Sequence, residues 1–157
     1  MNQIIISEAK VVSLPALNRL FTCAVHDHFG YFPSVVRERV IREHSVQKLF
    51  LATLDSRRVI LTARQGSKIV GYCFGAVPKR GPAQVFWLYM DPDYRGENIG
   101  VALLTRMLHL LEDRGAKTIS IATHDHRRYY ERQGFKFVRN TEVDSVKLDI
   151  LSFKVSP

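Results

Sequence analysis

An abrupt change of periodicity in the middle of the chain constrains the fold more than any other feature. Residues 84–90 (QVFWLYM) are apolar and aromatic, as is typical of a buried strand, and Asp91-Pro92 ends this run. Residues 96–114 then carry apolar side chains at helical spacing, and Gly115 supplies a C-terminal cap. The apolar stripe consists of Leu103, Leu104, Met107, Leu108 and Leu111. The chain therefore needs a fold in which a strand passes almost directly into a helix.

The remaining segments predict strands and helices on both sides of this point. Strands are expected over residues 4–13, 58–64, 68–76, 84–90, 118–122, 135–138 and 143–151. Helices are expected over residues 14–25, 35–50, 96–114 and 125–132. Strands joined by short turns pair antiparallel, and strands joined by a helix pair parallel. The predicted class is α/β, with a mixed, largely antiparallel sheet flanked by helices.

Length and composition predict one folded domain. The 157 residues are 46% hydrophobic, which suffices for one sizeable core over residues 1–157 and not for two. No apolar run reaches the roughly 20 residues that cross a bilayer. The start of the chain also lacks the basic segment of a secretory signal, so a cytoplasmic protein is expected. In that compartment Cys23 and Cys73 are expected to be reduced thiols in the core.

The chain is strongly basic, with a formal net charge of +8 and a pI of about 9.8. Nucleic acid, an anionic membrane or a small anionic ligand could each exploit this charge, and charge alone does not choose between them. The basic residues are scattered along the chain. Helix-turn-helix, RNP-type and zinc-finger patterns are absent from the sequence, which argues against nucleic acid.

The loop between the central strand and helix has the composition of a pyrophosphate-binding site. A helix start exposes unpaired backbone N–H groups and the positive end of the helix dipole. Gly96 and Gly100 allow an anion to approach the backbone closely, and Arg95 adds a positive charge. The P-loop and dinucleotide-binding patterns are both absent from the sequence. Two glycines alone, however, favour a tight strand-to-helix turn without a ligand.

A wider pattern favours the ligand-binding interpretation. Residues 90–100 (MDPDYRGENIG) resemble the acetyl-CoA-binding motif of the GCN5-related N-acetyltransferases (GNAT), which follows [RQ]-x-x-[GA]-x-[GA]. Arg95, Asn98 and Gly100 occupy the three signature positions. Asn98 replaces the usual glycine, and asparagine tolerates unusual backbone angles better than most residues.

A second motif lies downstream at a fitting distance. Residues 123–135 (THDHRRYYERQGF) are similar to the family's closing motif, x-[FY]-Y-E-x-x-G-F. His126 stands where the family usually has a small residue. Two motifs in the family's order make this resemblance far more specific than either motif alone.

The resemblance implies the GNAT (acyl-CoA N-acyltransferase) fold and an acetyl-CoA-dependent N-acetyltransferase. Its amine acceptor, a small amine or an amine of a protein or peptide, would attack the thioester directly in a ternary complex. The residues implied to bind acetyl-CoA are Leu88, Tyr89, Met90, Arg95, Gly96, Glu97, Asn98, Ile99 and Gly100. Tyr130 maps onto the tyrosine that gives a proton to the leaving thiolate, and Tyr129 is expected to be the core residue of the pair. An unperturbed tyrosine has a pKa of about 10 and is protonated at neutral pH.

The base that deprotonates the amine is not identified by sequence. Residues 84–90 lack the glutamate that many relatives carry on this strand. The candidates are Glu38, Asp91, His124, Asp125 and His126, besides a chain of water molecules. The acceptor is expected to contact His26, His28, Phe29, Tyr31, Phe32 and Trp87. Metal binding is not expected, because the spacing of His26 and His28 is not completed by further ligands.

A non-catalytic module that binds acyl-CoA as a sensor is the alternative. The missing acid on the strand and the substitutions at Asn98 and His126 motivate it. Turnover that depends on Tyr130 would distinguish the enzyme from the sensor. The resemblance leaves open whether the chain forms a homodimer.

Overall fold

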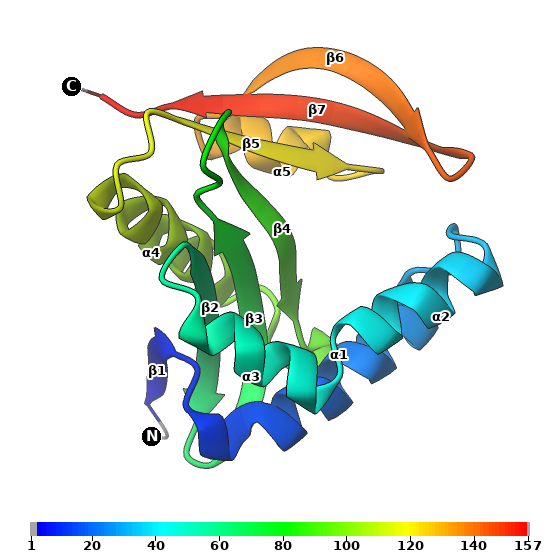
Figure 1. The fold of residues 1–157 in the computed structure, drawn as a ribbon, viewed down its shortest axis with the longest axis vertical. Coiled ribbons are helices and arrows are strands. Elements are labelled where there is room, and N and C mark those ends of the chain that lie inside the picture. The colour runs from blue at the N-terminus through cyan, green and yellow to red at the C-terminus, as the bar shows by residue number, and fades with distance from the viewer. Residues whose placement is uncertain (1–2, 157) are drawn as a thin grey trace.

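A computed structural model describes residues 3–156 as one seven-stranded sheet with helices on both faces (Figure 1). The strands are β1 (Ile4–Glu8), β2 (Arg58–Gln65), β3 (Lys68–Ala76), β4 (Ala83–Met90), β5 (Thr118–Thr123), β6 (Lys136–Val143) and β7 (Val146–Lys154). The helices are η1 (Val11–Ser13), α1 (Leu14–His28), α2 (Ser34–Glu43), α3 (Val46–Leu54), η2 (Pro92–Tyr94), α4 (Ile99–Asp113) and α5 (Arg127–Arg132).

The sheet order is β1-β2-β3-β4-β5-β7-β6. The β4–β5 pair is parallel, and the other neighbouring pairs are antiparallel. The predicted mixed, largely antiparallel sheet flanked by helices is therefore confirmed. Figure 1 shows β5, β7 and β6 swung away from the plane of β2, β3 and β4.

Each face of the sheet is covered by its own hydrophobic cluster. On one face α4 contributes the predicted apolar stripe, in which Leu103, Met107 and Leu111 are fully buried. On the other face α1 and α3 pack on the sheet, and the fully buried rings of Phe21 and Tyr72 lie 5.7 Å apart. Full burial of one such side chain stabilises a fold by about 1.5–3 kcal/mol. The two clusters fix β4 from both sides, which matters for the site described below.

The stretch at residues 35–50 forms two helices, where the sequence predicted one. The chain leaves the helical conformation at Ser45, whose φ of −60° and ψ of 161° are extended. The Ser45 hydroxyl accepts a hydrogen bond from the Lys48 N–H at 3.3 Å and so caps the start of α3. This break carries neither glycine nor proline, the residues that mark breaks most strongly in a sequence.

Two strand predictions and one cysteine prediction also need correction. The strand predicted over residues 4–13 ends at Glu8, and a short 3-10 helix follows. The strand predicted from residue 143 contains a turn at Asp144-Ser145, where φ is 50° and 66°. Positive φ at both central residues matches the twist of paired strands, so β6 and β7 form a tight hairpin. Cys73 is buried as expected, whereas Cys23 is exposed on α1.

His44 makes stability depend on pH. Its ring stacks on Phe21, with centroids 4.1 Å apart, and its Nδ1–H donates to the Val40 carbonyl at 2.7 Å. Burial lowers the pKa of His44 below 6.5, although the Val40 carbonyl opposes this shift. The unfolded chain therefore binds the proton more tightly, so the free energy of unfolding is greatest above pH 6.5 and falls as the pH drops below it.

We expect the melting temperature to fall between pH 7 and pH 5, and the fall to be smaller in His44→Phe. His109→Gln is the matched control, because His109 is exposed on α4. Scanning calorimetry across this pH range measures the effect. An equal acid slope in the wild type and in His44→Phe would show that His44 is not responsible.

Candidate active site

The sheet splits between its two central strands. β4 and β5 pair over Ala83–Val85 and Ile119–Ile121, and beyond this point β4 stays paired with β3 while β5 stays paired with β7. The register of β4 shifts at Phe86, which forms a bulge opposite β3. The backbone of β4 beyond the bulge thus presents an open edge, to which an extended ligand can add like a further strand.

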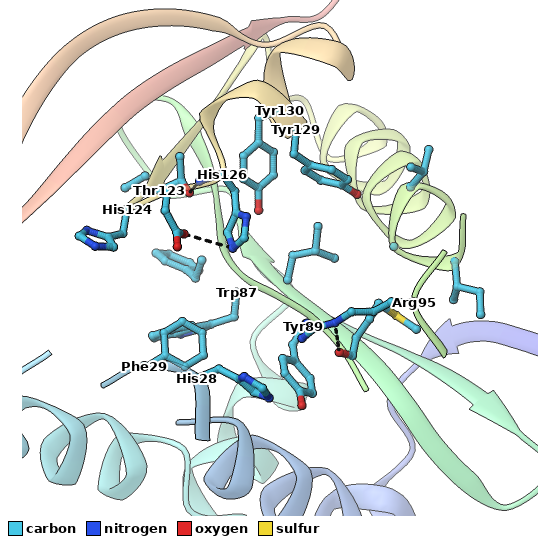
Figure 2. Close-up of a pocket in the computed structure, with 18 of the residues that line it drawn as sticks. His28, Phe29, Trp87, Tyr89, Arg95, Thr123, His124, His126, Tyr129 and Tyr130 are labelled. Carbon is cyan, nitrogen blue, oxygen red and sulfur yellow. Dashed lines mark hydrogen bonds and ion pairs between the residues drawn. The ribbon is translucent and has the colours of Figure 1, made fainter. Parts of the chain in front are cut away.

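A cavity of about 600 Å³ occupies this split. Its walls come from the end of α1 and the α1–α2 loop, β4, the loop before α4 and the start of α4, the β5–α5 loop, α5 and β7 (Figure 2). Side chains alternate along β4, so Trp87 and Tyr89 belong to the α1 face, while Leu88 and Met90 belong to the α4 face. The cavity therefore joins the two faces of the sheet through the split.

The structure brings together most of the predicted site residues. The predicted cofactor-binding residues on the wall are Leu88, Tyr89, Met90, Arg95, Gly96, Asn98, Ile99 and Gly100. Glu97 is not among the described lining residues. The predicted acceptor residues on the wall are His28, Phe29, Tyr31, Phe32 and Trp87, whereas His26 lies outside the described lining. Tyr130 lines the same cavity.

The helix predicted from Gly96 begins at Ile99, because the backbone before it is left-handed. Gly96 has a φ of 86°, and Asn98 has a φ of 60° and a ψ of 16°. Asparagine adopts this conformation more readily than most residues, so Asn98 can stand where the family usually has glycine. The first N–H groups of α4, at Ile99, Gly100 and Val101, have no acceptor within the helix. These donors and the positive end of the α4 dipole lie at the cavity wall, where they favour an anion.

The Arg95 side chain connects this loop to the end of β4 through a hydrogen bond. Its Nε donates a hydrogen bond to the Met90 carbonyl at 3.1 Å, and its guanidinium lies 5.8 Å from the centre of the Tyr89 ring. With Nε engaged, the outer guanidinium N–H groups are those suited to a bound anion. Arg95 thus both positions the loop and supplies positive charge at the cavity wall.

Tyr130 projects into the cavity from α5. The residue is 7% exposed, and its ring packs edge-on against Tyr129, at 5.1 Å, and Phe135, at 5.8 Å. Figure 2 shows its hydroxyl pointing into the cavity between the two walls. Burial raises the pKa of Tyr130 well above 10, so the hydroxyl is a proton donor at neutral pH. The expectation that Tyr129 is the core residue of the pair is wrong, since Tyr129 is only half-buried.

Three of the five candidate bases line the cavity, namely His124, Asp125 and His126. Figure 2 shows His124 and His126 across the cavity from Arg95. His126 Nε2 lies 3.2 Å from Asp125 Oδ1, and these side chains are 71% and 58% exposed. Glu38 and Asp91 lie outside the described lining. Asp91 instead pairs with Lys68 Nζ at 3.4 Å and helps to form the turn after β4.

Contacts across the outer end of the cavity join segments that are distant in sequence. The ring of Tyr31 stacks on that of His124, with centroids 4.2 Å apart and planes at 17°. The His124 Nδ1–H donates to the Lys147 carbonyl at 3.0 Å. Burial, and secondarily the negative charge of Asp125, raise the pKa of Tyr31 to about 12. The α1–α2 loop, the β5–α5 loop and β7 therefore meet at one point.

Several lining residues were not predicted. Phe86 reaches the cavity because the bulge interrupts the alternation of β4, and Leu148 reaches it from β7. Neither position carries a local sequence signal. Tyr94 and Thr123 also line the cavity and lie inside the two motifs already noted, so the motifs could have suggested them.

Within residues 3–156, no helix is long and apolar enough to cross a membrane. In the same part of the chain, no three His, Cys, Asp or Glu side chains are grouped as metal ligands would be.

Comparison with known proteins agrees with this architecture. Residues 22–135 match the Acetyltransferase (GNAT) family, and the chain belongs to that family. The predicted family is thus confirmed, and with it acetyl-CoA as the cosubstrate.

An uncharacterized N-acetyltransferase of Mycobacterium tuberculosis is 33% identical over 86 residues, which cover 52% of this chain and 55% of that protein. The chain thus spans about half the length of the curated relatives it matches.

Solved structures show similarity over nearly the whole chain. The PaiA N-acetyltransferase of Thermoplasma acidophilum, in complex with coenzyme A, has a TM-score of 0.80 and 21% identity, covering 98% of this chain and 99% of that one. The ribosomal-protein-S18-alanine N-acetyltransferase of Escherichia coli has a TM-score of 0.72 and 21% identity, covering 99% and 96%. These similarities confirm the predicted fold.

Proposed function

We propose that this protein transfers the acetyl group of acetyl-CoA to a primary amine by direct attack in a ternary complex. One observation carries the proposal: the cavity passes through the split sheet and joins the anion-binding start of α4 to an aromatic wall on the other face. Acetyl-CoA on one face of the sheet and an amine on the other can therefore meet there.

The loop and the strand edge together suit the two halves of the cofactor. The pyrophosphate would accept hydrogen bonds from the Arg95 side chain and from the backbone N–H groups of residues 96–101, and Glu97 would contribute through its backbone alone. The pantetheine arm would pair with the open edge of β4 at residues 88–90. A backbone N–H on this edge would also donate to the thioester oxygen, where negative charge develops during attack.

The remaining groups suit the two proton transfers. The amine nitrogen forms a bond to the carbonyl carbon, the carbon–sulfur bond breaks, and the Tyr130 hydroxyl gives its proton to the leaving thiolate. The protons lost by the amine pass to the titratable groups at the opposite wall, His124, Asp125 and His126. We further propose that the chain works as one N-acetyltransferase domain, since one sheet runs through the described residues, and that it acts in the cytoplasm.

A titration with acetyl-CoA tests the cofactor site. A ligand that binds only the folded state at 100 times its Kd adds about 2.7 kcal/mol to the free energy of unfolding. We expect a clear rise in melting temperature, weakened by Arg95→Glu and unaffected by the same charge reversal at Arg106, which is exposed on α4. No rise at millimolar acetyl-CoA would contradict the proposal. A rise without thiol release in the presence of any amine would favour the non-catalytic acyl-CoA-binding module.

The left-handed conformation of Asn98 allows a sharper test of the loop. Asn98→Gly should keep the affinity for acetyl-CoA, because glycine adopts a φ of 60° without strain. Asn98→Val should weaken that affinity about tenfold, because a left-handed backbone costs a residue with a Cβ roughly 1–2 kcal/mol. Isothermal titration calorimetry measures both. Equal affinities for the two variants would show that the loop binds no part of the cofactor.

A further inference from the structure

We propose that the acceptor is a monoamine with a compact apolar or aromatic body, whose ammonium group is held by Asp125. The inference deepens the proposed acetyl transfer and rests on it. It follows from what lines the acceptor end of the cavity, from the charges found there and from how that end is closed.

The wall at this end is an array of aromatic rings. Phe29 stands edge-on to Trp87 at 5.3 Å and to Tyr31 at 5.7 Å, and Tyr31 lies 4.9 Å from Phe32. Trp87 is supported from behind by the buried ring of Phe21 at 5.4 Å. Rings held in this way offer their faces both to a flat apolar group and to a cation.

Charge is sparse among the residues that line this end of the cavity, and Arg127, Arg128 and Arg132 line a neighbouring pocket that shares Asp125. Among the described lining residues Asp125 is the one carboxylate, and Arg95 is the one lysine or arginine. Arg95 is fixed to the end of β4, and Figure 2 shows it at the opposite end of the cavity from His124. A second ammonium group, as in a polyamine, would find no counter-charge here. The carboxylate of a free amino acid would likewise face neither lysine nor arginine.

The histidines at this end are already engaged. The His124 Nδ1–H donates to the Lys147 carbonyl, His126 Nε2 lies against Asp125, and the His28 ring lies 5.7 Å from that of Tyr89. Asp125 shares the contact with His126, but it is the one carboxylate among the described lining residues and so the one negative charge that can select the substrate. One carboxylate beside an aromatic wall matches one ammonium group on an apolar body.

Closure of the outer end limits the size of the acceptor. The Tyr31–His124 stack joins the two sides of the opening. Farther out, Arg39 Nη2 on α2 pairs with Asp144 Oδ2 in the β6–β7 turn at 2.7 Å. A polypeptide would have to break these contacts in order to place its amine beside the thioester, whereas a compact amine would not.

Steady-state kinetics at saturating acetyl-CoA test this inference. We would compare kcat/KM for 2-phenylethylamine, spermidine, L-phenylalanine and a short peptide with a free N-terminal alanine, following thiol release. We expect the value for 2-phenylethylamine to exceed the others at least tenfold. Asp125→Asn should lower it at least tenfold and raise KM, because the ammonium group then loses its counter-charge.

A second variant tests the same effect of charge through a gain in activity toward spermidine. A loss of folded protein cannot produce such a gain. Leu148→Asp would place a second carboxylate on the wall and should raise the ratio of kcat/KM for spermidine to that for 2-phenylethylamine at least tenfold. Lys154→Gln is the matched control on the same strand, because Lys154 is exposed, and it should leave the ratio unchanged.

The outcomes separate this inference from the proposed function. Preferred turnover of spermidine, phenylalanine or the peptide would overturn the acceptor class and leave acetyl transfer intact. An unchanged KM in Asp125→Asn, or an unchanged ratio in Leu148→Asp, would overturn the role of charge at this wall. Binding of acetyl-CoA without transfer to any amine would instead overturn the proposed function, and the acceptor class with it.

Discussion

Replacing Tyr130 with phenylalanine is expected to lower kcat about a hundredfold and to change KM little. General acid catalysis contributes roughly 10²- to 10⁴-fold to a rate, and phenylalanine removes the proton donor while keeping the buried ring. Because burial holds the pKa of Tyr130 well above 10, its deprotonation should not limit the wild-type rate between pH 6 and pH 9. Initial rates of thiol release across this range measure both effects.

Tyr129→Phe is the matched control for this experiment. Tyr129 lies next in sequence, lines the same cavity and is half-buried, yet we assign it no proton transfer. Its variant should keep kcat within about threefold. A similar small loss in Tyr130→Phe would show that another donor, such as a water molecule, protonates the thiolate.

Gly71→Ala should destabilise the fold and weaken binding of acetyl-CoA together. A Cβ at Gly71 would overlap Met90 Sδ and lie 2.9 Å from the Tyr89 carbonyl oxygen. Overpacking of this kind costs about 1–3 kcal/mol in the free energy of unfolding. The strain also reaches the binding loop, because the Arg95 side chain is hydrogen-bonded to the Met90 carbonyl. Urea unfolding and calorimetric titration with acetyl-CoA measure the two losses.

Gly30→Ala provides the comparison, because an added Cβ at Gly30 has open space around it. Its free energy of unfolding should change by less than about 0.5 kcal/mol, as is usual for surface substitutions. If Gly71→Ala lost no more than Gly30→Ala, the packing of β3 against Met90 would be looser than the structure indicates.

Periodic elements were predictable from sequence, and their ends were less so. The stripe containing Leu103, Met107 and Leu111 identified α4, because a regular repeat of buried side chains leaves a strong signal. The break between α2 and α3 has almost no sequence signal, since it depends on the hydroxyl of Ser45, which caps the start of α3. The turn at Asp144-Ser145 was missed for a similar reason, because two polar residues there adopt backbone angles more typical of glycine and asparagine.

Some residues of the candidate site could likewise be predicted from sequence and others could not. The cofactor side was predictable, because the loop and the start of α4 are contiguous in sequence and form a recognisable motif. Its acceptor side was only partly predictable. The contact of Tyr31 with His124 joins residues far apart in the chain, and Phe86 lines the cavity through a shift in strand register. Such contacts follow from tertiary packing and leave no local pattern.

The division of the sheet into two independently packed faces has an evolutionary consequence. The loop before α4 stands on one hydrophobic cluster, and much of the aromatic wall, including Phe29 and Trp87, stands on the other. Substitutions at separate sites tend to act additively. Related proteins can therefore accumulate substitutions in the α1–α2 segment and accept new amines, while the residues that bind the cofactor stay the same. For the same reason, grafting residues 29–33 from a relative is a practical route to altered acceptor preference.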